Sequence, residues 1–194
     1  IIQNFPDLHW TCKNRIDTVN PALLKLMKQA GCYMIAYGVE SGDDTILKGL
    51  NKNLTTNKIR KNLEATRNAG IRSLTYILIG SPGETKETVK NTVNLLKEQK
   101  VDFALFGELM PDTDSPLFKN LIKRGKIPKD AIRDLILHEN QDKLFAYTPS
   151  GHSRNTLNAW LSEANKSFYG RPSYILQRLF GLASPRDAFN MLSG

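Results

Sequence analysis

Hydrophobic residues in the first part of the chain change repeatedly between the two-residue spacing of strands and the wider spacing of helices. Runs typical of strands occupy residues 8–13, 32–39, 71–79 and 101–110. Segments with helical spacing separate them, at residues 21–30, 43–50, 55–69 and 84–97. This alternation predicts an α/β fold with a parallel sheet and right-handed crossovers, either doubly wound or formed as a barrel.

Capping signals and apolar stripes refine the helices. Asn20 followed by Pro21 is typical of a helix start. In the helix that follows, Leu23, Met27 and Ala30 recur at helical spacing. We therefore expect these three side chains to face the core.

The pattern changes after residue 111, where strand-like runs stop. Helices are predicted at residues 115–124 and 128–137, and a loop at residues 147–151. The stripe of the last clear helix consists of Leu157, Leu161, Ala164 and Phe168. We therefore divide the chain into a partial (β/α) barrel, residues 1–111, and a helical C-terminal extension packed on it, residues 112–194.

Composition and charge exclude several classes of protein. The 194 residues are 40% hydrophobic and 24% charged, as in ordinary globular proteins, and no apolar run is long enough to span a membrane. Cys12 and Cys32 are the only cysteines, which excludes a disulfide framework and favours a reducing, cytoplasmic location. The net charge is +8, but the basic residues are spread over helices, so nucleic acid is not the expected partner.

The chain begins at Ile1 instead of Met, in the middle of an apolar pattern. We therefore expect it to be a piece of a longer protein.

Two strand-like runs end in glycine-containing turns that suit ligand binding. The run at residues 76–79 enters a Gly-Ser-Pro-Gly turn at residues 80–83, and Glu84 is expected to start the next helix. The run at residues 33–37 enters Gly38, with Glu40 two residues later. Glycine lets the backbone approach a ligand closely, and a helix start offers free N–H groups. Both turns fall at the carboxyl ends of strands, where parallel α/β folds bind ligands.

Glu40 is the leading candidate for a binding side chain. Alternation along the strand places it on the same face as Met34, Ala36 and Gly38, and this face of smaller side chains is expected to point into the barrel. Its carboxylate could accept two hydrogen bonds, for example from a ribose diol. A structural ion pair or a helix cap explains the residue equally well.

Other charged residues are weaker candidates. Lys52 could hold a ligand carboxylate as a point charge, or be a solvated lysine. Arg15 lies at the same end of the predicted barrel, and could pair with Glu40 or hold an anionic ligand. Glu108 lies near the end of the fourth strand. The histidines show no metal-ligand or triad spacing and are expected to be structural or surface residues; they are His9, His138 and His152.

An ordered set of short motifs resembles the later half of a radical S-adenosylmethionine (SAM) enzyme. In chain order these are residues 10–15 (WTCKNR), 30–32 (AGC), 38–42 (GVESG), 50–52 (LNK), 69–71 (AGI) and 80–85 (GSPGET). The tail segment at residues 168–174 (FYGRPSY) resembles the C-terminal region of the cobalamin-binding branch, which includes anaerobic cyclases and many radical methyltransferases.

The resemblance implies a (β/α)6 radical SAM barrel, of which residues 1–111 are the later strands. SAM would lie across the carboxyl ends of the strands and chelate a 4Fe–4S iron–sulfur cluster. An electron from the cluster would cleave SAM to methionine and a deoxyadenosyl radical, and this radical would abstract hydrogen from a small-molecule substrate. By this resemblance Glu40 binds the SAM ribose, Lys52 binds its methionine carboxylate, and Arg15 lies near its methionyl end. The other implied cofactor-binding residues are Ser41 and, near the adenine, Ile79, Gly80 and Pro82.

Departures from the family pattern qualify this hypothesis. The CxxxCxxC loop is absent, and two separated cysteines cannot replace its three thiolates. The first two barrel strands and any cobalamin-binding domain are absent too. Residues 111–113 read Pro-Asp-Thr where relatives usually have Pro-Gly-Thr, and Lys52 replaces an arginine found in some branches. We therefore expect these residues to form half of a SAM pocket and to be inactive alone, with cobalamin use by the parent protein left open.

Two other hypotheses stay open. The chain could be a cluster-free relative that acts as a binding or scaffold module, or an ordinary TIM-barrel enzyme that binds phosphate at residues 80–85. If the chain is a truncated barrel, the first strand, residues 8–13, lacks its preceding strand and is expected to form an exposed edge. We expect self-association or domain swapping through that edge.

Overall fold

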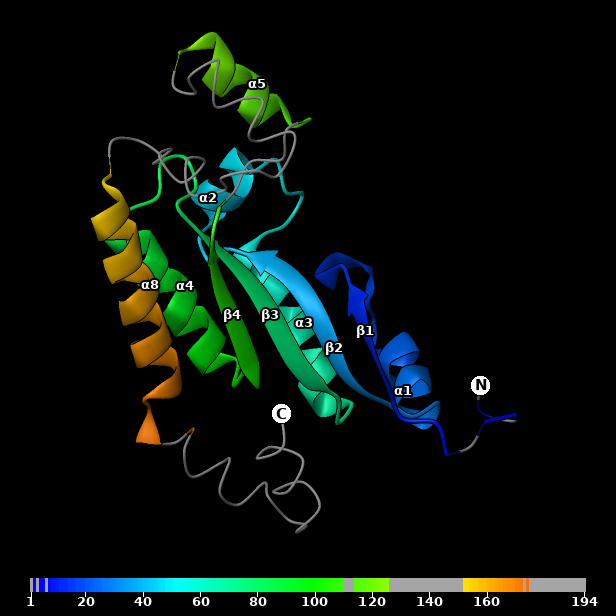
Figure 1. Ribbon diagram of the computed structural model, residues 1–194. Helices are drawn as coiled ribbons and strands as arrows, with labels where there is room; N and C mark the ends of the chain where they lie inside the picture. The colour runs from blue at the N-terminus through cyan, green and yellow to red at the C-terminus, as the bar shows by residue number, and fades with distance from the viewer. Residues whose placement is uncertain are drawn as a thin grey trace.

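The computed structural model describes residues 2, 4, 5, 7–109, 114–125, 152–172 and 174, and a four-stranded parallel sheet lies at its centre (Figure 1). The strands are β1 (Trp10–Asn14), β2 (Cys32–Glu40), β3 (Arg72–Ile79) and β4 (Phe103–Glu108). They pair side by side in the order of the sequence, and each pairing is parallel. A doubly wound sheet reverses its strand order, whereas a barrel does not. The fold is therefore an α/β barrel segment, one of the two architectures predicted.

Helices connect the strands, and most begin at a residue whose side chain accepts a hydrogen bond from a free backbone N–H. The helical elements before β4 are η1 (Ile16–Thr18), α1 (Pro21–Gln29), α2 (Asp44–Gly49), α3 (Thr56–Asn68) and α4 (Lys86–Glu98). Those after it are α5 (Pro116–Lys123) and α8 (Arg154–Tyr169). The capping residue of α1 is Asn20, as predicted, and those of α2 and α3 are Asp43 and Thr55.

The hydrophobic core lies between the sheet and the helices on one of its faces. On β2, the side chains of Ile35, Tyr37 and Val39 are fully buried in this layer. The alternate residues Met34 and Gly38 are only partly buried, because they point to the other side of the sheet. We call that other side the open face. Figure 1 shows α3 and α4 behind the sheet, with none of the described helices in front of β2 and β3.

The apolar stripe predicted for α1 is partly wrong. Leu24 is fully buried, whereas Leu23 is 38% exposed and Leu26 is 55% exposed. The buried stripe of this short helix therefore runs through Leu24 and Met27 and leaves Leu23 outside it.

Tyr33 departs from the alternation expected for β2, since it is 44% exposed. The register explains this difference. Trp10 of β1 pairs with Cys32 and Thr11 pairs with Met34, so that Tyr33 has no counterpart and forms a bulge.

Helix α8 packs against α4 and β4. Its residues Leu157, Ala164 and Phe168 are buried in the same core as the sheet, together with Trp160, which the predicted stripe omitted. At its C-terminal end, the hydroxyl of Tyr169 accepts a hydrogen bond from the backbone N–H of Ala104 (3.0 Å) and donates one to the carbonyl of the same residue (2.7 Å). The helix therefore covers part of the outer edge of β4.

The division of the chain at residue 111 stays a prediction. The segments predicted at residues 128–137 and 147–151, the motif at residues 111–113, the tail beyond residue 174 and His138 lie outside the described residues. Within the described residues, no helix is both long and apolar enough to cross a membrane.

Candidate functional site

The first glycine turn contains a strained residue at the end of β2. Gly38 pairs with Tyr76 of β3 and Glu40 pairs with Ile77, so Val39 is an extra residue that forms a bulge. Glu40 itself has a φ of 66°, in the left-handed region that non-glycine residues rarely adopt. Such strain and such bulges concentrate at functional sites, where they direct a side chain.

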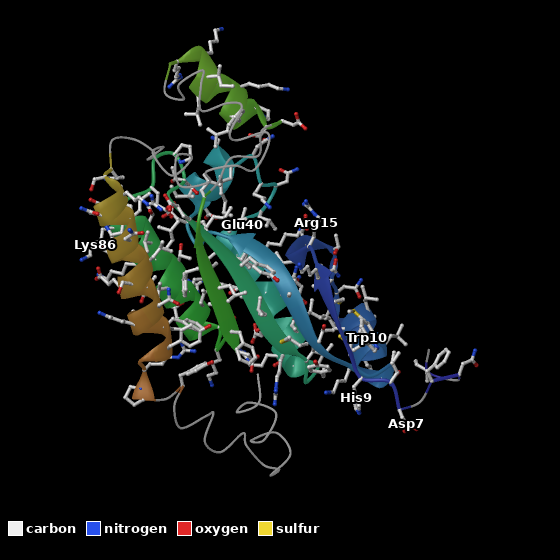
Figure 2. The ribbon with its side chains drawn as sticks, in the orientation of Figure 1. Asp7, His9, Trp10, Arg15, Glu40 and Lys86 are labelled. Carbon is white, nitrogen blue, oxygen red and sulfur yellow. The ribbon has the colours of Figure 1, made fainter. Side chains whose placement is uncertain are left out.

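The Glu40 carboxylate lies over Gly38, on the open face. A Cβ atom added to Gly38 would lie 2.9 Å from Oε1 of Glu40, closer than real Cβ contacts. Residue 38 must therefore lack a side chain if the carboxylate is to stay in this position. Figure 2 shows Glu40 and Arg15 at the same end of the sheet, with His9 and Trp10 at the other.

Lys52 is the ion-pair partner of Glu40. Its Nζ donates a hydrogen bond to Oε1 of Glu40 (3.0 Å), and the exposed fractions of the two side chains are 32% and 14%. The turn after α2 positions the lysine, since Asn51 takes a φ of 54° and the backbone N–H of Lys52 donates to the carbonyl of Leu47 (3.0 Å). Two residues predicted separately for SAM therefore meet, and the ion-pair alternative for Glu40 is also present.

Arg15 does not pair with Glu40, so that alternative is wrong. Its Nη2 lies 2.8 Å from Oδ2 of Asp17, and its side chain is 62% exposed. The guanidinium lowers the pKa of the Asp17 carboxyl, mainly through this hydrogen bond. The pair forms because the short turn of η1 brings Asp17 back to the end of β1, two residues from Arg15.

Ser41 is fully buried and serves the turn after β2. Its Oγ lies 3.3 Å from Oγ1 of Thr92 on α4 and accepts a hydrogen bond from the backbone N–H of Asp43 (3.2 Å). The N–H of Gly42 also donates to Oγ1 of Thr92 (2.8 Å), and a Cβ on Gly42 would lie 2.6 Å from the Thr92 Cα. The turn thus rests directly on α4, a contact that sequence motifs did not reveal.

Glu84 holds the second glycine turn together, which corrects the role expected from the sequence. Helix α4 begins at Lys86 with Thr85 as its cap, so Glu84 lies before the helix and is not its starting residue. Its side chain is buried, and Oε2 accepts hydrogen bonds from the N–H groups of Gly80 (2.5 Å) and Ser81 (3.0 Å).

Burial raises the pKa of the Glu84 carboxyl, although the hydrogen bonds from Gly80 and Ser81 oppose the shift. Asp43 raises this pKa further and His152 lowers it, both to a smaller extent. His152 Nε2 also donates to the backbone carbonyl of Glu84 (3.1 Å), which agrees with the structural role predicted for this histidine.

The remaining predicted residues lie around the second turn. Ile79 has its side chain in the core, 1% exposed, and its carbonyl accepts from the N–H of Leu109 (2.8 Å). Gly80 has a φ of 101°, a conformation that favours glycine. Pro82 lies next to α2, since a Cβ on Gly49 would be 3.9 Å from the Pro82 carbonyl oxygen. Because the side chain of Ile79 lies in the core, a ligand at the carboxyl end of β3 could contact Ile79 through its backbone alone.

Glu108 belongs to the opposite side of the sheet from Glu40. Burial raises the pKa of the Glu108 carboxyl, and Arg154, the first residue of α8, opposes this shift. Its neighbour two residues earlier, Phe106, contacts Phe168 of α8. Glu108 thus faces α8 and lies outside the candidate site.

Strand order and the polar turns at the carboxyl ends define a barrel-type α/β domain with a candidate ligand site, and comparisons with known proteins narrow this class. The sequence model of the radical SAM superfamily matches residues 5–96. The predicted resemblance to that superfamily, and to its methyltransferase and cyclase branch, is thereby confirmed.

Similar curated proteins extend over most of the chain. An uncharacterized methyltransferase of Pyrococcus horikoshii is 27% identical over 174 residues, which are 90% of this chain and 37% of that protein. An anaerobic magnesium-protoporphyrin IX monomethyl ester cyclase of Cereibacter sphaeroides is 28% identical over 124 residues, 62% of this chain and 20% of that protein. The chain thus spans well under half the length of either relative.

Solved structures share the fold. The radical SAM methyltransferase TsrM from Kitasatospora setae, with cobalamin and an iron–sulfur cluster bound, has a TM-score of 0.59 at 19% identity, over 66% of this chain and 27% of that chain. The radical SAM enzyme coproporphyrinogen III oxidase (HemN) from Escherichia coli has a TM-score of 0.58 at 14% identity, over 85% of this chain and 32% of that chain. The partial-barrel architecture is therefore that of radical SAM enzymes.

The site fits SAM, and the cysteines do not fit a 4Fe–4S cluster. Gly38 leaves a cradle for a directed carboxylate, and Lys52 supplies a cation beside it. Cys12 and Cys32 are the two cysteines of the chain, one partly buried and one buried, and the cluster needs three thiolates. Among the residues that the structure describes, no group of three or more His, Cys, Asp or Glu side chains could hold a metal ion.

Proposed function

We propose that this chain supplies the SAM-binding half of a radical SAM enzyme. The observation that carries the proposal is Glu40, whose carboxylate is held by a bulge and a left-handed backbone over Gly38 at the carboxyl end of the sheet. Strain of this kind costs about 1–3 kcal/mol and needs a reason beyond folding. SAM, when bound, supplies the deoxyadenosyl group that abstracts hydrogen from a substrate.

The residues of the chain would bind and orient this cofactor. The Glu40 carboxylate would accept hydrogen bonds from the ribose hydroxyls, and the Lys52 ammonium would bind the methionine carboxylate. Backbone groups at Gly80 and Pro82 would contact the adenine edge. Ser41 would act indirectly, by fixing the turn that follows Glu40 to α4. Arg15 would lie near the methionyl end, with Asp17 already beside it.

The activity of the parent protein is part of the proposal. A 4Fe–4S cluster would be bound by a part of the parent other than these residues, since the two cysteines do not fit it. We propose that the parent catalyses cobalamin-dependent methyl transfer or cyclisation of a small-molecule substrate, because its relatives include a methyltransferase and a cyclase. The residues described here would be inactive alone and would act in the cytoplasm.

Calorimetric titration with SAM tests the role of Glu40. We expect Glu40→Gln to weaken SAM binding by about 1.5–3 kcal/mol, the usual contribution of hydrogen bonds to a charged group. Exposed Glu87→Gln on α4 is the matched control and should bind like wild type. Equal affinities of wild type and Glu40→Gln would remove Glu40 from the site.

Two further variants separate strain from binding. The free energy of unfolding of Glu40→Gly should be about 1–2 kcal/mol higher than that of Glu40→Ala, because glycine accepts the left-handed conformation without a steric penalty. Both should lose the SAM affinity. In the full-length parent, reconstituted anaerobically with iron and sulfide, formation of deoxyadenosine should disappear with Glu40→Ala.

A second observation bears on the phosphate-binding alternative. The N–H groups of Gly80 and Ser81, which such a turn would offer to a phosphate, already donate to the Glu84 carboxylate. A buried acidic group at this position also repels an anion, which disfavours phosphate binding here. A scaffold role without a cluster would instead be supported if the parent failed to bind iron and to cleave SAM.

A further inference from the structure

A lysine and a tyrosine meet on the open face, next to the Glu40 carboxylate. Nζ of Lys13, on β1, lies 5.7 Å from the centroid of the Tyr76 ring, on β3. Between these strands lies β2, so the contact of the two side chains spans a whole strand. A cation over an aromatic face within about 6 Å is a favourable contact.

The residues of β2 that pair with Lys13 and Tyr76 are small. Lys13 pairs with Ala36, and Tyr76 pairs with Gly38. These two positions of β2 therefore place little side-chain volume on the open face between β1 and β3.

The charges on this face are unbalanced. Glu40 is neutralised by Lys52. Neither Lys13 nor Arg72, which lies on the open face at the start of β3, has a carboxylate partner among the described residues. Leu74 lies on β3 two residues before Tyr76, and both side chains are partly buried, whereas Lys13 is exposed. Within the part of the chain that the structure describes, an anionic group beside Tyr76 would therefore meet the charge of Lys13.

We propose that Lys13 and Tyr76 form a subsite for the carboxylate of a small-molecule substrate that has an apolar or aromatic body. The ammonium would bind the carboxylate as a point charge, and the body would lie on Tyr76 and Leu74. A single lysine on an apolar surface suits a monoanion better than a phosphate dianion, which calls for several donors. The inference rests on the proposed function, because it places the substrate beside the SAM pocket.

Binding of model compounds to the full-length protein tests this subsite. The probes are 2-naphthoate, the neutral 2-naphthamide of the same shape, and 2-naphthyl phosphate, each titrated by fluorescence. Lys13→Met should weaken 2-naphthoate binding by about fivefold, the upper range for a partly exposed ion pair, and leave 2-naphthamide unchanged. Tyr76→Leu should weaken both. Lys25→Met, on the exposed side of α1, is the control and should change neither.

Equal binding of 2-naphthoate by wild type and Lys13→Met would overturn the proposal, as would preference of the wild type for 2-naphthamide. Tighter binding of 2-naphthyl phosphate than of 2-naphthoate would overturn the assignment to a carboxylate. SAM titration of the same variants separates this result from the proposed function, since Lys13→Met should keep the SAM affinity. Lys13-dependent naphthoate binding without any SAM binding would reject the proposed function and retain the subsite.

Discussion

Position 38 and the side chain of residue 40 share one space on the open face. The Oε1 atom of Glu40 lies where the first side-chain atom of residue 38 would press against it. The requirement for glycine at position 38 is therefore set by the carboxylate, and not by the φ angle of Gly38, which lies outside the left-handed region.

Gly38→Ala should displace the Glu40 carboxylate and weaken SAM binding, with little loss of stability. The expected loss in affinity is about 1–2 kcal/mol, the size of a hydrogen bond that is lengthened or lost. Gly107→Ala is the matched control, because a Cβ on this β4 glycine meets no atom within 4 Å. Titration of both variants with SAM, together with urea unfolding, measures the affinity and the stability. Equal losses of SAM affinity in the two variants would contradict the conclusion that residue 38 and the Glu40 carboxylate occupy the same space.

Glu84 stabilises the fold through the hydrogen bonds that its carboxylate accepts from two backbone N–H groups. Glu84→Ala would leave the buried N–H groups of Gly80 and Ser81 without a partner, and we expect it to lower the free energy of unfolding by about 2–4 kcal/mol. Glu84→Gln keeps an acceptor oxygen and should lose much less. Urea unfolding of the two variants decides this, and a larger loss with glutamine would contradict it.

The raised pKa of Glu84 gives this residue a pH signature. Between its ordinary pKa and the raised one, the folded state binds more protons than the unfolded state, so the stability due to Glu84 falls as pH rises. Glu84→Gln does not titrate. Its stability relative to wild type should therefore increase as pH rises through this window. Unfolding of both proteins at a series of pH values tests the sign, with Glu87→Gln as an exposed control.

At the scale of the elements, local signals were enough to predict the helices. The cap Asn20 was readable because capping depends on a few successive residues. The bulges at Tyr33 and Val39 were not, because a bulge exists only relative to the neighbouring strand. The sequence therefore predicted the strands and their parallel pairing, left their spatial order open between two architectures, and missed the two bulges that shift which face a side chain occupies.

The candidate site shows the same limit. Glu40 and Lys52 were both identified, but their ion pair depends on the turn after α2 and was not. Arg15 was considered as the partner of Glu40, and the nearer Asp17 takes it instead. Glu84 looked like a helix start because it precedes a capped helix, and its inward orientation depends on the tight turn at Gly80.

Helix α8 protects the edge of β4 through one hydroxyl group. Tyr169→Phe removes both hydrogen bonds to Ala104, and should lower the free energy of unfolding by about 1–2 kcal/mol, since the backbone N–H is left without this partner. Tyr33→Phe, an exposed tyrosine on β2, is the control and should be neutral. If Tyr169→Phe lowered the free energy of unfolding no more than Tyr33→Phe, water would be shown to replace the hydroxyl group of Tyr169.

At the scale of the whole molecule, the two outer strands differ. The edge of β4 is covered by Tyr169, whereas no described segment pairs with the outer edge of β1. Exposed apolar residues also gather in the chain around β1, on the segment before it and on α1. They are Ile2, Phe5, Leu8, Leu23 and Leu26. An open edge beside apolar surface favours pairing with another chain.

We therefore expect this chain to self-associate through β1 when it is expressed by itself. Leu8→Lys together with Leu26→Lys should shift the population toward monomer, because a charge beside an edge opposes pairing. Leu105→Lys, an equally exposed position on β4, should not. Sedimentation velocity over a wide range of protein concentration measures this, and a wild-type chain that stays monomeric throughout would contradict the expectation.

The ion pair between Glu40 and Lys52 has a consequence for how ionic strength affects binding. A neutral nucleoside such as adenosine offers hydroxyl groups to Glu40 but nothing to the lysine that it must displace, whereas SAM brings a carboxylate for that lysine. Dissolved salt weakens partly exposed ion pairs. Adenosine should therefore bind more tightly as salt is added, while the affinity for SAM should stay level or fall. Opposite salt dependences for two ligands that share a ribose would reveal the competition between lysine and ligand for one carboxylate.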